Sequence, residues 1–180
     1  GKAGARPDRA TICYCKKLRE IYGDVPIAIG GIEASLRRFA HYDYWDDAVR
    51  QSILIDSTAD ILMYGMGEKH IVEFADRLNS GEKISDLTDI LGTCYAVNSS
   101  DYNHIKGACE CPSFESVSEN SENGKLQYAK ATKIQQAEAD AARGKTIIQK
   151  HGKKILVQNP PMPPLNESEM DEVYALPFMR

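Results

Sequence analysis

Apolar residues recur along the chain at two different spacings, and these spacings predict its first helices and strands. Residues about 9–22 and 68–79 place apolar side chains three and four positions apart, which is typical of helices with one buried face. Short apolar runs over 25–29 and 61–64 indicate buried strands. Shorter helices are expected over 33–39 and 46–56. Alternating helices and strands predict an α/β fold with parallel strands and helical crossovers.

The second half of the chain has a less regular pattern. It predicts a strand over 93–97, a helix over 125–142, a hairpin over 146–158 and a last helix over 168–175. Between the first two, residues about 98–122 are polar and rich in turn formers, so we expect a mobile loop there. The prolines at 160–164 predict an extended connector. The expected organisation is an α/β region, 1–92, followed by an irregular extension with a helix and hairpin, 93–180.

Composition narrows the class of protein. Of the 180 residues, 42% are hydrophobic and 27% charged, which is typical of a globular chain. The net charge of −4 does not favour binding to nucleic acid or to an anionic membrane. No apolar run approaches the ~20 residues that a membrane-spanning helix needs. Five cysteines without a disulfide pattern favour a reducing, cytoplasmic location.

The residues that follow the first predicted strand carry the densest group of polar and aromatic side chains. Gly30 and Gly31 come directly after this strand, where α/β proteins bind ligands. Their backbone amides, with the start of the next helix, are suited to receive an anion. The alternative is that two glycines simply let the chain turn sharply after a buried strand.

Charged residues of the next predicted helix form a second group. Glu33 and Arg37 are four positions apart, so they can form an ion pair on one helix face. The other interpretation is that Arg37 or Arg38 binds a carboxylate or phosphate of a ligand through two parallel hydrogen bonds. The sequence leaves both interpretations open.

The run from His41 to Trp45 adds a histidine, an aspartate and three aromatic residues. We expect His41 and Asp43 to form a structural hydrogen-bonded pair, because a metal site would need further ligands at suitable spacing. Trp45 and the neighbouring tyrosines are expected to pack this loop against another domain. The candidate substrate-binding or domain-interface residues are therefore Gly30, Gly31, Glu33, Arg37, Arg38, His41, Asp43 and Trp45.

The cysteines do not form a convincing metal site. Cys13 and Cys15 would point about 200° apart around a helix, which is poor for chelation. Cys15 falls on the apolar face of that helix, where a thiol packs as a small hydrophobe. Cys109 and Cys111 form a second C-x-C pair, with Cys94 alone between the two pairs. We therefore predict no metal ligation by this chain.

Several long segments resemble one known family. They are Pro26–Trp45, Ser52–Asp56, Ala59–Gly65, the opening Gly4–Thr11, and the later runs Gln158–Pro161 and Met170–Phe178. These segments closely resemble the YgiQ-like radical SAM family, from near the first residue to near the last. The resemblance is weakest over about 93–150.

The resemblance implies a larger parent protein. In this family a C-x3-C-x2-C motif lies a short way beyond the Leu-Pro-Phe segment, and further strands lie upstream of the region matched here. The chain is therefore expected to be the later part of the domain before the radical SAM barrel. The parent would bind a [4Fe–4S] cluster and S-adenosylmethionine, with an unknown substrate.

Within such a parent, the chain itself would hold no cofactor and no catalytic residue. Its expected partner is the radical SAM barrel of the same polypeptide, and its role would be to cap the barrel or help recognise substrate. The fold is expected to be a partial Rossmann-like or cobalamin-binding-like three-layer sheet. Cobalamin is not expected, since the D-x-H-x-x-G motif is absent. The alternative function is a non-enzymatic α/β module that binds a protein or ligand.

Overall fold

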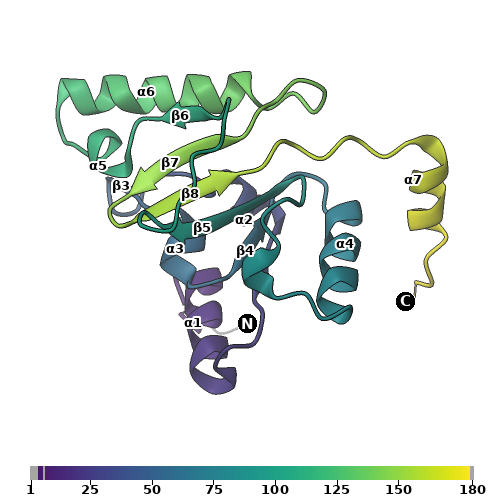
Figure 1. Ribbon diagram of the computed structural model, residues 1–180. Coiled ribbons are helices and arrows are strands. Elements are labelled where there is room, and N and C mark those ends of the chain that lie inside the picture. Colours follow the sequence, from purple (N-terminus) through teal and green to yellow (C-terminus); the bar gives the residue numbers. More distant parts are fainter. Residues whose placement is uncertain (1–3, 6, 179–180) are drawn as a thin grey trace.

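The computed structural model describes residues 4–5 and 7–178. The remaining residues of the two predicted regions, 1–3, 6 and 179–180, lie outside the described part. The class is α/β, as predicted: a six-stranded sheet with helices packed on both of its faces (Figure 1). Within the described residues, no helix is both long enough and apolar enough to cross a membrane.

The main sheet has the strand order β1-β4-β5-β8-β7-β6. Its strands are β1 (Ala28–Ile29), β4 (Ile61–Met63), β5 (Thr93–Asn98), β6 (Cys109–Cys111), β7 (Ile147–His151) and β8 (Lys154–Gln158). Neighbours β1–β4 and β6–β7 are parallel, whereas β4–β5, β5–β8 and β7–β8 are antiparallel. The parallel pair β1–β4 was predicted, and antiparallel strands extend it into a mixed sheet.

The helices of the structure have the following bounds. They are α1 (Ala10–Tyr22), α2 (Gly31–Leu36), α3 (Ile53–Ser57), α4 (Glu68–Asn79), α5 (Phe114–Val117), α6 (Glu122–Ala137) and α7 (Glu167–Tyr174), with a 3₁₀ turn, η1, at Ile84–Asp86. In Figure 1, α6 runs alongside β6, and α7 stands apart from the sheet at the end of an extended connector.

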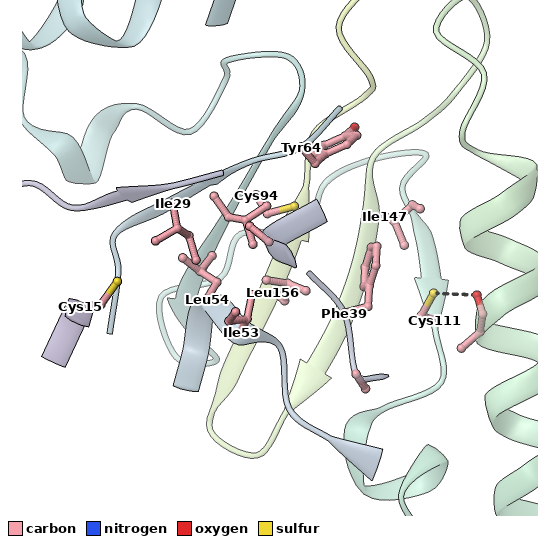
Figure 2. Packing of buried hydrophobic residues seen from close by; sticks show 14 of the residues in the cluster. Cys15, Ile29, Phe39, Ile53, Leu54, Tyr64, Cys94, Cys111, Ile147 and Leu156 are labelled. Carbon is pink, nitrogen blue, oxygen red and sulfur yellow. Dashed lines mark hydrogen bonds between the residues drawn. The ribbon is translucent and has the colours of Figure 1, made fainter. Parts of the chain in front are cut away.

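Alternate side chains of β4 divide the core between the two faces of the sheet. Leu62 joins a large cluster with Cys94 and Leu156, to which α1, α3 and α6 contribute (Figure 2). Ile61 and Met63 point to the opposite face, where α4 and η1 cover them. Successive strand residues face opposite sides of a sheet, so three consecutive buried residues require cover on both.

Three sequence predictions are wrong in detail. The predicted helix over 46–56 is only α3, because residues 41–50 form the two-stranded hairpin of β2 (His41–Asp43) and β3 (Ala48–Arg50). The loop expected over 98–122 contains β6 and α5, and the helix expected to reach 142 ends at Ala137. β6 forms because it pairs with the distant strand β7, and α5 packs against α6 and β7, contacts that short-range spacing does not report.

The sheet contains strands from both sides of residue 92. β1 and β4 come from the predicted first region, whereas β5 to β8 come from the second, and β5 pairs with β4. The division of the chain into regions 1–92 and 93–180 stays a prediction.

Candidate functional site

The hairpin β2–β3 is the scaffold of the candidate site. His41 pairs with Arg50 and Asp43 pairs with Ala48, so a four-residue turn, 44–47, joins the strands. Asp47 takes a left-handed backbone with φ of 48°, and its carboxylate accepts a 2.7 Å hydrogen bond from the Tyr42 hydroxyl. Aspartate tolerates this conformation better than most residues, which favours a tight turn here.

Asp43 is the buried anchor of this hairpin. Asp43 is only 4% exposed. Its carboxylate accepts hydrogen bonds from Arg9 at 2.9 Å and from the backbone N–H of Trp45 at 3.0 Å. Arg9 also donates to Asp46, and Arg50 donates to Asp46 at 2.8 Å. The two arginines therefore join α1 to both strands of the hairpin through charge-assisted hydrogen bonds.

This arrangement keeps Asp43 ionised. Burial opposes the charged form of Asp43, but the hydrogen bonds from Arg9 and Trp45 outweigh it, so the pKa of Asp43 is lowered. The same contacts raise the pKa of Arg9, mainly through its hydrogen bonds to Asp46 and Asp43. The cluster is a fixed set of charges rather than a proton donor near neutral pH.

The Gly30–Arg37 segment is also fixed by local contacts. Gly31 has φ of 79°, a left-handed conformation that favours glycine, and it opens the six-residue α2. The Arg37 guanidinium donates to Glu33 at 3.0 Å, so the first of the two interpretations, an ion pair on one helix face, is present. The Thr11 hydroxyl donates to Glu33 at 2.6 Å. Glu33 thus joins α2 to α1, and anion binding by the Gly30–Gly31 amides stays a prediction.

Arg38 points to a different part of the molecule from Arg37. Its Nε donates to the side chain of Gln158 at 2.6 Å, and its guanidinium lies 4.9 Å from the centre of the Tyr64 ring. Gln158 is the last residue of β8, so Arg38 ties α2 to the centre of the sheet. A cation on an aromatic face with a partner at Nε is well satisfied in place. These contacts favour a structural role for Arg38.

His41 and Asp43 do not bond to each other, contrary to the expected pair. The Nδ1 atom of His41 lies 3.1 Å from the carbonyl oxygen of Phe39, and burial lowers the pKa of this histidine. The adjacent Ala40 N–H donates to the buried Gln149 side chain at 2.8 Å. The same oxygen of Gln149 lies 3.1 Å from Nε2 of His151. Buried polar groups on β7 therefore hold the base of the hairpin.

The tip of the hairpin is aromatic and open to solvent. Tyr44 is 67% exposed and Trp45 is 77% exposed, and their rings stack with centroids 5.0 Å apart. Beneath Trp45 lies a cavity of about 270 Å³ that Arg9, Arg37 and Asp43 help to line. Rigid, exposed aromatic side chains beside charged groups are typical of surfaces that bind partners.

The structure thus brings most, but not all, of the candidate residues together. Arg37, Asp43 and Trp45 share one cavity, whereas Arg38 faces the sheet. Sequence reasoning did not select Arg9, Asp46 or Arg50, which fix the hairpin. Arg9 belongs to the opening segment that resembles the family. Its contact with Asp43 spans 34 positions, so no local sequence pattern indicates it.

The buried cysteines are protonated thiols packed in the core. Burial raises the pKa of Cys94 and of Cys111 to about 12. Cys111 contacts the backbone oxygen of Ala131 on α6, and Cys15 lies on the buried face of α1. Across residues 4–5 and 7–178, no three His, Cys, Asp or Glu side chains are grouped to hold a metal ion.

The structure is thus an α/β domain with two exposed, stacked aromatic side chains at the tip of a hairpin. Comparison with known proteins shows the family to which the chain belongs. The family described as "Radical SAM N-terminal" matches residues 1–180. The chain belongs to this family, which confirms the resemblance seen in its sequence.

Curated relatives share this region but are much longer. A "UPF0313 protein" of Clostridium botulinum strain ATCC 19397 is 57% identical over 180 residues, which cover 100% of this chain and 27% of the relative. A "UPF0313 protein" of Clostridium perfringens strain SM101 is 54% identical over 100% of this chain and 26% of the relative. The chain therefore spans about a quarter of the length of these relatives. No solved structure shows a significant match.

Proposed function

We propose that this chain is an accessory domain of a radical SAM enzyme, and that it acts by docking rather than by chemistry of its own. The observation that carries this proposal is the family match over residues 1–180, together with relatives of which the chain covers 27%. The family description implies a parent that binds a [4Fe–4S] cluster and S-adenosylmethionine. The barrel that holds them would be the partner of this domain, in the cytoplasm.

The aromatic hairpin is the surface that we assign to this docking. The ion pairs of Asp43 with Arg9 and of Asp46 with Arg50 hold the turn end of the hairpin, so we expect the backbone of its turn to be ordered before a partner arrives. Preorganised aromatic side chains lose little conformational entropy on binding and often dominate interface energies. Trp45 and Tyr44 would contact the barrel or the substrate, with Arg37 and His41 beside them.

The test uses the full-length protein with its cluster reconstituted under anaerobic conditions. We expect Tyr44→Ala with Trp45→Ala to lower formation of 5′-deoxyadenosine about tenfold, the effect of losing roughly 1.4 kcal/mol of interface energy. The control is Tyr22→Ala on α1, which removes a tyrosine of similar exposure, 64% against 67% for Tyr44. Equal activity of the double variant and the control would contradict the assigned surface.

A non-enzymatic binding module is the second candidate, because an exposed aromatic surface serves it equally well. Arg37→Ala and His41→Ala in the full-length protein separate the two. A lower turnover with unchanged folding supports the accessory role in an enzyme. Loss of a partner without any effect on turnover, or full-length protein that binds no cluster, favours the binding module.

A further inference from the structure

An apolar groove of about 870 Å³ lies between α4 and α7. Its apolar lining consists of Ile71, Val72, Leu165, Val173 and Leu176. Three of these are large and strongly exposed: Ile71 is 45%, Val72 is 57% and Leu176 is 65% exposed. The apolar spacing of this helix predicted that Ile71 and Phe74 are both buried; α4 buries Phe74, together with His70, but leaves Ile71 exposed.

Helix α7 has little within the described chain to hold it. It is eight residues long, and none of them is buried. Its contacts are an ion pair between Lys69 of α4 and Glu169, and a capping box formed by Asn166 and Glu169. Isolated helices this short are marginal in water, because most helical stability comes from tertiary packing. A stable α7 therefore needs a further surface against its apolar side.

The charge around the groove restricts what that surface is. Lys69 is paired with Glu169, and Arg77 is paired with Glu82 and Asp89. The remaining charged side chains of the lining include Glu68, Asp76 and Glu172, and within residues 4–5 and 7–178 these form no ion pair. The groove is thus apolar at its centre and acidic at its rim. Its complement is an apolar segment flanked by lysine or arginine.

We propose that this groove is the docking site for a basic amphipathic segment of the same polypeptide. The segment would come from the part of the protein that the relatives have outside the matched region, which is about three-quarters of their length. Helix α7 is the last element of the described chain, so a segment from that part is held close to the groove at high effective concentration. This docking site rests on the proposed function in one respect, since both require that the chain is part of a longer polypeptide. It does not depend on radical chemistry.

Hydrogen exchange of the full-length protein tests whether the groove is covered. We expect the amides of α7 to be protected on the order of 100-fold relative to an unstructured chain, because only a covered helix of this length is stable. Val72→Asp and Leu176→Asp place a carboxylate in the groove and should remove most of this protection. Full exchange of α7 in the unmodified protein would overturn the proposal.

Leu126→Asp on α6 provides a matched control. Leu126 is 68% exposed and Leu176 is 65% exposed, so the two substitutions have nearly the same direct cost. We expect Leu126→Asp to leave the exchange of α7 unchanged. An equal loss of protection in both variants would mean that α7 responds to general destabilisation, which contradicts a specific docking site.

Carbodiimide cross-linking identifies the occupant. It joins carboxylates directly to neighbouring lysines, and we expect Glu68, Asp76 or Glu172 to be joined to lysines outside residues 1–180 of the same molecule. A mixture of unlabelled and ¹⁵N-labelled protein shows whether each link is within one molecule. Links between two copies would replace the proposed segment with a dimer, and an absence of links to basic residues would overturn the charge argument. Both outcomes are independent of cluster binding, so they leave the proposed function intact.

Discussion

The β2–β3 hairpin and helix α7 both present apolar or aromatic side chains to solvent, but they are held in opposite ways. The hairpin has a buried carboxylate, Asp43, with two arginines and a backbone N–H around it. Helix α7 has no buried residue of its own and a single ion pair to α4. An element with a satisfied polar anchor can project exposed side chains rigidly, whereas an element without one depends on a partner for its order.

This difference gives the two surfaces different physical characters. The hairpin is preorganised, so a partner that meets Trp45 does not have to order the loop first. The α4–α7 groove gains its order when it is covered, so docking there would stabilise the fold itself. Four predictions can break or sharpen this contrast.

The largest expected effect is a loss of folding stability at acidic pH, caused by His151 next to the residues that hold the start of the hairpin. Burial lowers the pKa of His151 from 6.5 to about 4. The unfolded chain then binds a proton below pH ~6.5 that the folded chain accepts only near pH 4, so stability falls as the pH falls through this range. The loss is roughly 3 kcal/mol between pH 7 and pH 4. Burial lowers the pKa of His70 in the same direction, so the slope of the unmodified protein is at least this large.

Urea unfolding of the chain at a series of pH values measures this effect. Because Trp45 is the only tryptophan, its fluorescence follows the hairpin directly. His151→Gln should reduce the slope between pH 6.5 and pH 4 by the share of His151, and leave the share of His70. An unchanged slope in this variant would show that His151 does not control the base of the hairpin.

Removal of the anchor should have the next largest effect. Asp43→Ala leaves Arg9 without its buried partner, and we expect a loss of about 2 kcal/mol in the free energy of unfolding. Arg9 keeps its contact with Asp46, which limits the loss. The urea midpoint measures it, with Asp46→Ala as a control at a more exposed carboxylate. A loss no larger than that of the control would mean that the hairpin is not held by its anchor.

The helix caps at α7 and α6 provide a matched pair of smaller effects. The Asn166 side chain accepts from Glu169 N at 3.0 Å, and the Ser121 side chain accepts from Gly124 N at 3.0 Å. Each cap contributes about 1 kcal/mol to its own helix. Because α6 buries Gly124 and Ala131, Ser121→Ala should lower global stability by this amount. Asn166→Ala should instead only speed the exchange of α7 amides about fivefold, and a global loss would show that α7 belongs to the cooperative core.

The smallest effect on stability is expected at the aromatic tip. Tyr44 and Trp45 are strongly exposed, so Tyr44→Ala and Trp45→Ala should change the free energy of unfolding by less than about 0.5 kcal/mol each. Thermal unfolding followed by circular dichroism measures this without the tryptophan signal. A loss above 1 kcal/mol would assign these rings to packing within the domain and weaken the docking proposal.

Much of the secondary structure was predictable because it depends on local spacing. The bounds of α4, Glu68–Asn79, agree with the predicted helix, and the hairpin of β7 and β8 was also expected. The Glu33–Arg37 ion pair followed from four-residue spacing alone. These features arise between residues that are near in sequence, so the sequence contains their whole pattern.

The candidate site depended on contacts that the local pattern does not contain. The sequence selected the aromatic run and Asp43. The expected partner of Asp43, His41, bonds elsewhere, and the actual partner is Arg9, the residue before α1. Likewise Arg38, predicted as a ligand-binding candidate, is held by Gln158 from 120 positions along the chain. The functional interpretation of each charged residue changes with its long-range partner.

The sequence by itself determined the family, the α/β class and which segments form most helices. These depend on residue identity and periodicity, which are properties of the chain alone. Only the tertiary structure decided that residues 41–50 form a hairpin, that Asp43 is its buried anchor, and that α4 and α7 enclose an acidic-rimmed groove. Burial and charge pairing are set by which distant segments meet, and no local pattern of residues encodes that meeting.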